Sequence, residues 1–535
     1  MNRSFCPGLP YYCSLIAFVM LLSAGPVEGG TIDPELSRQL DTAPTVREFA
    51  VLVKLKKRAE PGVAKTPFDH ETRHARATKT VRRLKSEAGL SQQELKTALE
   101  LKESFGRARG TKQFWVFNGI ATTATADTIR ELAARTDVEE VVQDRIFTLA
   151  TAAPANLVTV TDSWNLARIG AQTLWSMGFT GQGVVVANLD TGVDISHSAL
   201  ASKWRGGSNS WFDPFNSSPV PYDLSGHGTA TMGIMVAGNT SDNLVGVAPG
   251  AQWIAAKIFD DANPPQTTLS KIHQAFQWVL DPDGNPATDD SPDIVNNSWD
   301  MDNPGLYDSE FAADIQNLKA AGISVVCVSG NVLVPQPSGT STSPGNNPGA
   351  FPVGATTEYD LIAYFSARGP SAYDGSSYPA VVAPGAAIRS TDLYNTYVSF
   401  SGTSFAAPHV AGALALLKSA IPGLSAQDAE TALKNSVVSG SGPNNTYGYG
   451  RLDAAKAYAY LATPGDVNGD GKIDFIDVMI ALRTIVGLIP ANPLISKNAN
   501  LFPLGLNGKP QGHSGGVNLQ DAILILQRAA GFVNW

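Results

Sequence analysis

The sequence predicts an α/β protein whose central parallel sheet is covered by helices on both faces. Between residues 156 and 463, short runs of consecutive apolar residues alternate with longer amphipathic stretches. A strand buried on both faces is apolar along its whole length, and helices between such strands indicate a parallel sheet. The predicted strands are 184–189, 253–258, 294–298 and 324–328, and the predicted helices are 269–280, 309–321, 406–418 and 426–436.

Length and composition indicate several folded units. A chain of 535 residues exceeds what one hydrophobic core organises, and 43% apolar with 16% charged residues is typical of a globular protein. Of the three cysteines, Cys6 and Cys13 lie in the predicted leader. Once the leader is removed, Cys327 has no partner for an intramolecular disulfide. We expect four segments: a leader (1–30), a small α+β domain (31–155), the α/β domain (156–463) and a small helical module (464–535).

The leader has the pattern of a secretory signal. Arg3 precedes an apolar run over 14–22 and small residues over 23–30. The run is shorter than the roughly 20 residues that span a bilayer, although an uncleaved anchor is an alternative. We expect cleavage between Gly25 and Gly30, secretion to the extracellular space or cell envelope, and no membrane span in the mature chain.

The segment after the leader differs from the rest in charge. Residues 31–150 carry a net charge of +4, whereas residues 151–535 carry −13. Attraction between the two parts would favour their docking. The basic residues alternate with Glu and are not clustered with aromatics, which argues against nucleic-acid binding. The predicted elements are strands 48–55, 113–124 and 138–143, a helical region over 68–105 and a helix over 126–135.

Three polar residues stand where reactive groups collect in such folds. Asp190 ends a buried strand, and His227 starts a helix between Gly226 and Gly228. Ser404 stands at the first turn of the helix predicted over 406–418. Backbone N–H groups and the helix dipole there favour developing negative charge. A serine nucleophile needs a base and a group that orients the base. A plain helix N-cap is the alternative role of Ser404.

The stretches 184–194, 225–229 and 401–412 resemble the subtilisin-like serine proteases (subtilases), and so does the order Asp190, His227, Ser404. The resemblance implies peptide-bond hydrolysis through an acyl-enzyme. Ser404 would be the nucleophile, His227 the general base and then acid, and Asp190 the orienting carboxylate. Asn331 would join the Ser404 N–H as oxyanion donor, with a plain turn asparagine as the alternative. The chain departs from the family at 230–233, where a second His and Val-Ala are common.

The resemblance also implies that residues 31–155 are an inhibitory propeptide that helps the enzyme fold. Its tail, Phe147 to Ala155, would lie in the cleft like a product, and autolytic cleavage would fall between Ala150 and Leu157. The alternative is an ordinary interaction domain.

Substrate backbone recognition is expected at Asn297, Ser298 and Trp299, interpreted as an edge strand to which a peptide adds. Trp299-Asp300 stands where the family often has Leu-Gly. Asp300 would either favour basic side chains or point into solvent.

A twelve-residue calcium loop is predicted over 466–477. Gly471 stands at position 6, and oxygen ligands stand at positions 1, 3, 5, 7, 9 and 12: Asp466, Asn468, Asp470, the Lys472 carbonyl, Asp474 and Asp477. The loop and following helix resemble dockerin type I repeats. A second repeat, 507–518 with the helix 519–529, keeps only Asp521 as a clear carboxylate, so we expect one ion. The module would bind a cohesin-like or cell-surface partner or lock the C-terminus; an Asp/Gly-rich linker is the alternative.

Two other functional classes remain open from the sequence. One is a catalytically silent protease fold used as a calcium-dependent scaffold. The other is a serine hydrolase that does not act on peptides. Cys327 is interpreted as a core residue, since no histidine motif accompanies it.

Overall fold

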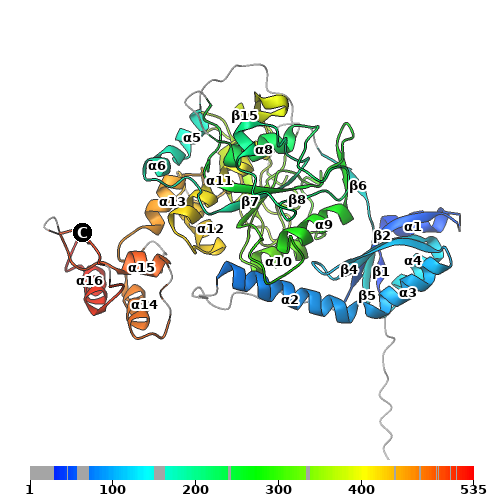
Figure 1. The fold of residues 1–535 in the computed structure, drawn as a ribbon, viewed down its shortest axis with the longest axis horizontal. Coiled ribbons are helices and arrows are strands. Elements are labelled where there is room, and N and C mark those ends of the chain that lie inside the picture. Colours follow the sequence, from blue (N-terminus) through cyan, green and yellow to red (C-terminus); the bar gives the residue numbers. More distant parts are fainter. Residues whose placement is uncertain are drawn as a thin grey trace, which may run out of the picture.

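Three bodies follow one another along the chain in the computed structural model (Figure 1). The described residues are 29–44, 46–56, 72–149, 163–238, 243–332, 338–438, 442–468, 472–489, 491, 493–505, 508–513 and 515–535. Residues 1–28 of the predicted leader, the predicted cleavage segment 150–157, Asp470 and Gly471 lie outside them. Among the described helices, none combines the length and apolarity needed to cross a membrane.

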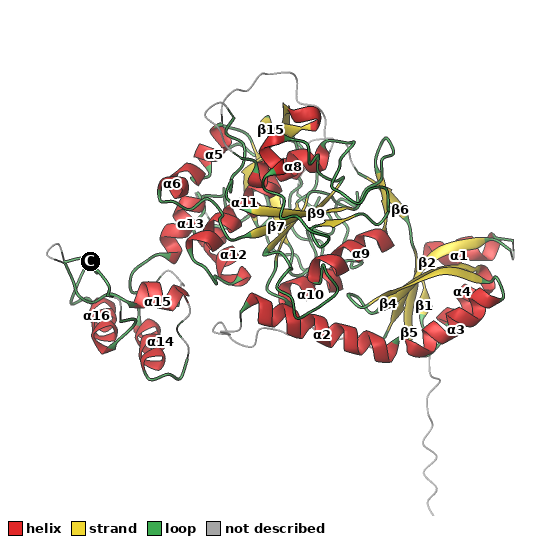
Figure 2. Cartoon of the chain, in the orientation of Figure 1, coloured by secondary structure: helices red, strands yellow, loops and turns green. Residues whose placement is uncertain are grey.

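The central domain is built on a seven-stranded sheet in the order β14-β13-β12-β11-β7-β9-β8, with every pair parallel. Helices cover both faces (Figure 2). Successive residues of β12 alternate between the two cores: Val326 packs with α8 and α11, whereas Val325 and Cys327 pack with α9 and α10. This confirms the predicted fold class and the predicted burial of Cys327.

The central domain contains these elements: α5 (Trp164–Arg168), α6 (Ala171–Ser176), β7 (Val185–Asp190), α7 (Ser198–Ala201), β8 (Trp211–Phe212), α8 (His227–Val236), β9 (Gln252–Lys257), β10 (Gln266–Thr268), α9 (Leu269–Leu280), β11 (Ile294–Asn297), α10 (Ala312–Ala320), β12 (Ser324–Val328), β13 (Phe351–Thr356), β14 (Val381–Pro384), β15 (Ile388–Asp392), the short 3-10 turn η1 (Leu393–Asn395), β16 (Thr396–Phe400), α11 (Thr403–Ala420), α12 (Ala426–Asn435) and α13 (Ala454–Leu461). Each predicted strand and helix is present to within three residues. The strands β13 and β14 were not predicted, because Pro352 and Gly354 interrupt one pattern and the other is only four residues long.

The N-terminal domain has a five-stranded sheet in the order β1-β5-β2-β4-β3, with helices packed against it. The predicted single strand over 113–124 is wrong, since the chain turns at 115–118 and forms the antiparallel hairpin β3–β4. Asn118 adopts a left-handed conformation (φ +55°) before Gly119, a turn signal that the strand prediction overlooked. The elements are β1 (Thr31–Ile32), α1 (Pro34–Thr42), β2 (Glu48–Leu55), α2 (Arg73–Ser91), α3 (Gln93–Ser104), β3 (Ala108–Phe114), β4 (Gly119–Thr125), α4 (Ala126–Ala133), β5 (Val138–Gln143) and β6 (Ile146–Thr148).

The N-terminal domain docks on the face of the central domain formed by α9 and α10 (Figure 1). Leu52, Val81 and Phe114 belong to the same hydrophobic core as these two helices. Gln277 accepts hydrogen bonds from the backbone N–H groups of Trp115 (2.7 Å) and Val116 (3.3 Å) through Oε1. The docked surface is therefore a continuous apolar core edged by backbone hydrogen bonds.

The C-terminal module is a helical body with its own core, and it contacts the central domain through Leu494, which belongs to the central core, and through Asn498, which donates to the Leu461 carbonyl (2.8 Å). It contains α14 (Phe475–Ile485), α15 (Pro493–Ala499) and α16 (Leu519–Ala529). The two long helices begin alike, since Asp474 with Asp477 and Asn518 with Asp521 each form a capping box. The sequence repeat is therefore also a structural repeat.

Candidate active site

Asp190 occupies the carboxyl end of β7, a central strand. Its side chain is 1% exposed, and its Oδ1 accepts hydrogen bonds from His227 Nδ1 (2.7 Å) and the Thr191 backbone N–H (2.7 Å). Thr231 Oγ1 donates to Oδ2 (3.3 Å). A buried carboxylate is costly unless it is paired, so these partners fix its position.

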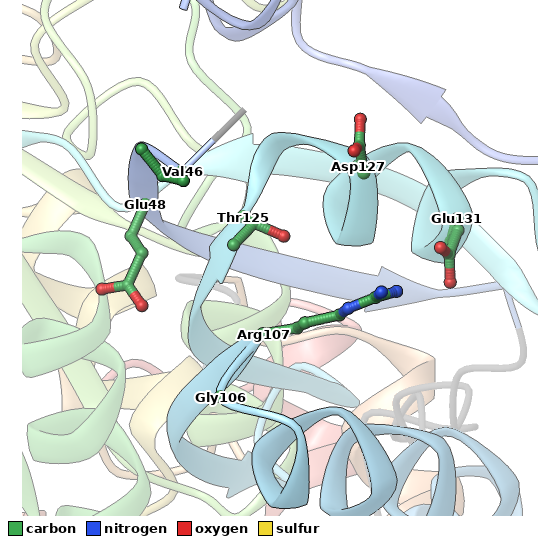
Figure 3. Close-up of a pocket in the computed structure, with 7 residues that line it drawn as sticks. All are labelled: Val46, Glu48, Gly106, Arg107, Thr125, Asp127 and Glu131. Carbon is green, nitrogen blue, oxygen red and sulfur yellow. The ribbon is translucent and has the colours of Figure 1, made fainter. Parts of the chain in front are cut away.

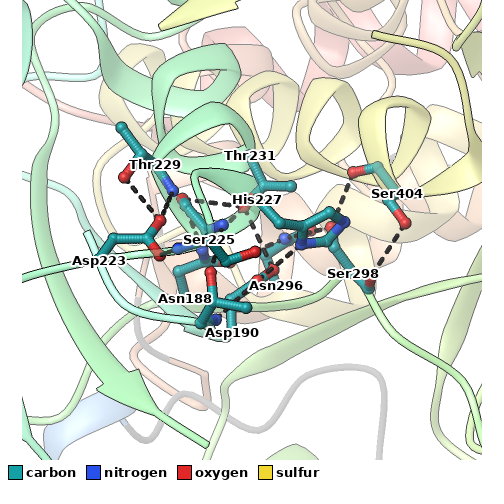
Figure 4. A network of polar contacts seen from close by, with 12 residues as sticks. Asn188, Asp190, Asp223, Ser225, His227, Thr229, Thr231, Asn296, Ser298 and Ser404 are labelled. Carbon is teal, nitrogen blue, oxygen red and sulfur yellow. Dashed lines mark hydrogen bonds and ion pairs between the residues drawn. The ribbon is translucent and has the colours of Figure 1, made fainter. Parts of the chain in front are cut away.

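His227 is the first residue of α8, with its ring between Asp190 and Ser404 (Figure 4). Burial disfavours the imidazolium, but the Asp190 charge and hydrogen bond outweigh burial and raise the pKa of His227 above its usual value. Nε2 is buried and has no hydrogen-bond partner within the described part of the chain. The nitrogen opposite the carboxylate is therefore available for proton transfer.

The glycines beside His227 allow close packing of the backbone around it. A Cβ on Gly228 would lie 2.1 Å from the Gly192 carbonyl oxygen. Gly226 has φ +86°, and a Cβ there would lie 2.4 Å from Asp392 Oδ1. Gly228 lets the start of α8 approach the end of β7 closely enough for His227 to reach Asp190, and Gly226 lets the same turn approach the end of β15.

Ser404 is the second residue of α11 and is buried. Its Oγ donates to the Ser298 carbonyl (3.0 Å), and Ser298 Oγ donates to the Ser404 carbonyl (2.8 Å). The ring of the next residue, Phe405, lies 5.6 Å from the His227 ring between centroids. The fold thus brings the three predicted residues together, but the Ser404 hydroxyl is turned to Ser298 and not to His227.

Asn331 follows β12 and is tied to the start of α11. Its Oδ1 accepts hydrogen bonds from Thr403 N (2.9 Å) and Thr403 Oγ1 (3.0 Å). Because the carbonyl oxygen is held in this way, the amide NH₂ is the end of the side chain left to face a ligand.

The four predicted substrate-contacting residues lie at the end of β11. The expectation of an edge strand is wrong, since β11 lies between β7 and β12 and Asn297 pairs with Cys327. Trp299 is 2% exposed and packs in the core. Asp300 is half-buried, and burial raises the pKa of its carboxyl group to about 6. Hydrogen bonds from the backbone N–H groups of Asp302 and Asn331 offset part of this rise, because they stabilise the carboxylate. Its carboxylate therefore lies beside Asn331 and does not point into solvent.

An extended segment of the N-terminal domain is added to the edge of β10. Strand β6 pairs with β10 in antiparallel register, and Leu149 N donates to the Pro265 carbonyl (2.9 Å). The Phe147 ring lies 6.2 Å from that of Trp299. The strand that takes up an extended segment is therefore β10 and not the predicted 297–299. Strand β10 is only three residues long, and its sequence has no pattern that would have indicated this role.

Several polar residues around the three were missed by sequence reasoning. Asn188 Nδ2 donates to Thr231 Oγ1 (2.9 Å), and Asn296 Nδ2 donates to Asn188 Oδ1 (3.0 Å) and Ser298 Oγ (2.9 Å). The network links β7, α8 and β11 to Ser298 (Figure 4). A signal was present, because Thr231 stands one turn after His227 in a largely apolar helix and the two asparagines interrupt apolar strands.

The C-terminal loop supplies oxygen atoms around the start of α14. Asp477 Oδ1 accepts from the backbone N–H groups of Val467 (2.7 Å) and Asn468 (3.1 Å), and Asp466 and Asp477 are both fully buried. Asp474 caps α14, and Lys472 is the remaining predicted ligand among the described residues. An all-oxygen set of this kind suits Ca²⁺.

A hollow of about 420 Å³ lies on the N-terminal domain, apart from the predicted site residues (Figure 3). It is lined by Val46, Glu48, Gly106, Arg107, Thr125, Asp127 and Glu131.

The sequence of this chain also matches two known protein families, and both matches agree with the observed arrangement. Residues 181–450 match the Subtilase family, and residues 50–150 match the Peptidase inhibitor I9 family. The chain therefore belongs to the subtilase family and has the subtilisin-like α/β fold preceded by a propeptide-type domain.

Individual relatives are proteases by name. Bacillopeptidase F of Bacillus subtilis (strain 168) is 34% identical over 436 residues, which cover 75% of this chain but only 30% of that protein. Subtilisin Savinase of Lederbergia lenta is 33% identical over 55% of this chain and 97% of its own length. The alkaline protease of Alkalihalobacillus alcalophilus is 33% identical over 57% of this chain and 72% of its own.

We predict that Gly228→Ala lowers stability, because the added Cβ cannot fit against the Gly192 carbonyl. Overpacking of this kind costs about 1–3 kcal/mol, which thermal unfolding would detect. Gly238→Ala is the matched control in the same domain, since a Cβ at that site meets its nearest atom, the Ala199 carbonyl oxygen, at an ordinary 3.5 Å. Equal midpoints for the two variants would contradict the close approach of α8 and β7.

Proposed function

We propose that the chain is a secreted serine endopeptidase, made as an autoprocessed zymogen. The observation that carries this proposal is the buried Asp190–His227 pair, 2.7 Å between Oδ1 and Nδ1, beside Ser404 at the start of α11. Asp190 orients the imidazole and stabilises its cation, and Nε2 serves as the base.

The reaction begins when the Ser404 hydroxyl turns from Ser298 toward His227 Nε2. Oγ attacks the peptide carbonyl carbon while its proton passes to Nε2, which gives a tetrahedral oxyanion and an imidazolium. The imidazolium then protonates the leaving amine as the C–N bond breaks. Water repeats the sequence on the acyl-enzyme, and Ser404 regains its proton.

The oxyanion is stabilised by two donors. One is the Ser404 backbone N–H at the start of α11, and the other is the Asn331 amide, whose opposite end Thr403 holds. Donors that are already oriented stabilise the developing charge without reorganisation during the reaction.

Substrate binds as an extended strand along β10, as β6 does, and approaches Asn297, Ser298 and Trp299 from the carboxyl end of the sheet. The Asp300 carboxylate beside Asn331 favours substrates with basic side chains near the scissile bond. The pairing of β6 with β10 also supports autoinhibition, since the chain's own tail takes the place of a substrate strand.

The C-terminal module is proposed as a dockerin-like calcium module. Its two similarly capped helices and the oxygen ligands Asp466, Asn468, Asp474 and Asp477 support one calcium ion there. Its partner would be cohesin-like or part of a cell surface.

One observation favours a second candidate, a silent protease fold used as a scaffold. The hydrogen bond from Ser404 Oγ to the Ser298 carbonyl replaces the bond to His227 that an active serine requires. The following experiment separates the two candidates.

A fluorophosphonate should label Ser404 of the wild-type protein and abolish casein hydrolysis, whereas a thiol reagent should not, because Cys327 is buried. The wild type should also release its propeptide, with a new N-terminus between residues 150 and 157. The Ser404→Ala variant should keep its propeptide, which intact mass would show. An unlabelled, unprocessed wild type would identify the chain as a scaffold.

Asn331→Ala should lower kcat on the order of 10²- to 10³-fold with little change in KM, because one oxyanion donor is lost. Steady-state kinetics on a peptide substrate would measure both constants. Asn435→Ala, at an exposed site on α12, should leave both constants unchanged. Activity of Asn331→Ala within threefold of the parent would exclude the role of oxyanion donor.

The pH profile of kcat/KM should have its acid limb above the usual histidine pKa of about 6.5, because Asp190 raises the pKa of His227 and the base must be neutral. Asp190→Asn removes that charge, so the limb should move to lower pH while kcat falls about 10⁴-fold. An acid limb that stays in place in Asp190→Asn would show that another group controls it.

A further inference from the structure

A second group of acidic residues lies far along the chain from the C-terminal loop. Asp281, Asp283 and Asp290 belong to the segment between α9 and β11, and each offers a carboxylate oxygen within 4.8 Å of the other two. Asp281 and Asp290 are buried, and Asp283 is exposed. The Asp283 backbone N–H donates to Asp290 Oδ2 (3.0 Å), which holds the two ends of the loop together.

A cation from the N-terminal domain already occupies part of this loop. The Lys85 ammonium, on α2, donates to Asp281 Oδ2 and to the Gly284 carbonyl (2.9 Å). A carboxylate oxygen and a main-chain carbonyl are the ligand types that Ca²⁺ takes in protein loops. Lys85 therefore marks a place where the central domain accepts positive charge.

The other carboxylate oxygen of Asp281, Oδ1, has no comparable donor or cation beside it among the described residues. Asp281 Oδ1 is buried and has no hydrogen-bond partner among the described residues, and the side chain is only 1% exposed. A buried carboxylate oxygen without a donor is unfavourable unless a cation approaches it.

The neighbouring Arg205 guanidinium does not hydrogen-bond to the three carboxylates, and Asn209 Nδ2, a neutral donor, is the side chain that donates to Asp290 Oδ2 (3.1 Å). Arg205 donates through Nη1 to the Asp290 backbone carbonyl (2.6 Å) and through Nε to Ser210 Oγ (2.9 Å). The acceptors of Arg205 are neutral, so its one positive charge stands beside the three proposed ligand carboxylates once Lys85 has left, and Asp289 of the same loop loses Arg73 at the same time. The remaining negative charge matches a divalent cation.

The same helix holds the whole acidic segment in the docked state. Thr78 Oγ1 donates to the Pro286 carbonyl (2.7 Å), and Arg73 lies 3.2 Å from Asp293 and also binds Asp289. Helix α2 runs along α10 beneath the central domain (Figure 1). Departure of this helix would expose the loop and remove Lys85 from it.

We propose that the loop 281–290 is a calcium site of the central domain, with Asp281, Asp283, Asp290 and the Gly284 carbonyl as ligands. In the docked state Lys85 takes the place of the ion. Calcium and the α2 helix therefore compete for the loop, and calcium opposes re-docking of the N-terminal domain after its release. The site itself does not depend on proteolysis, whereas its effect on the released domain rests on the proposed zymogen.

The test measures bound calcium per chain by equilibrium dialysis, in the full-length chain carrying Ser404→Ala so that the N-terminal domain stays attached. Adding Lys85→Met should increase the bound calcium by one ion per chain, with a Kd on the order of 10⁻⁵ to 10⁻³ M. Adding Asp283→Asn to that variant should weaken the extra site at least tenfold. The C-terminal loop is present in all variants and cancels from the comparison.

Lys96→Met is the matched control, because Lys96 is a surface lysine of the same domain that pairs with Glu100 on α3. It should leave the calcium count unchanged. An unchanged count in Lys85→Met, or a gain that Asp283→Asn leaves intact, would overturn the proposal.

If Lys85→Met lowers the thermal midpoint, its calcium count would reflect a change in stability as well as the loss of the ammonium group. A second comparison, which leaves Lys85 in place, then tests the site. Wild-type protein that has released its N-terminal domain is compared with its Asp283→Asn form, in which the substituted side chain is exposed and keeps an oxygen for the Asn285 N–H. The wild type should bind one calcium more than Asp283→Asn. Equal counts would exclude the site, whereas failure of the chain to process would bear only on the proposed protease function.

Discussion

The need to pair one buried carboxylate organises the centre of the molecule. Asp190 lies at the end of a central strand, where an unpaired charge would cost several kcal/mol. Its partners come from the Thr191 backbone, Thr231 and His227, so α8 must begin directly over the end of β7. Glycines at that crossing permit the approach, and α11 brings Ser404 beside the same ring. Geometry suited to catalysis and the satisfaction of a buried charge are thus met by the same contacts.

The N-terminal domain meets the central domain through two kinds of contact. Apolar side chains of its sheet and α2 complete the core around α9 and α10. Basic groups are set at the edges: Lys54 lies 2.8 Å from Glu310, and Lys85 binds Asp281. The apolar contacts supply most of the driving force, whereas the charged pairs fix the register and respond to solution conditions. Charge asymmetry along the sequence indicated attraction between the two parts, but the structure assigns it to particular pairs.

Much of the fold was predictable because its strands are buried on both faces and its helices have regular ends. The segments 324–328 and 269–280 were predicted to the residue. Errors arose where local pattern is weak or is overridden. The hairpin β3–β4 was taken for one strand, β14 is too short for periodicity, and the end of β11 was taken for a sheet edge although two strands flank it.

By itself, the sequence determined the fold class, the family resemblance and the candidate residues Asp190, His227 and Ser404, because these depend on residue type, spacing and order. Only the tertiary structure decided which strand takes up an extended segment, which way the Ser404 hydroxyl turns, and that a lysine at position 85 meets an aspartate at position 281. Those contacts join parts of the chain separated by up to about 200 residues. No local pattern encodes such a pairing, since it follows from how the whole core packs.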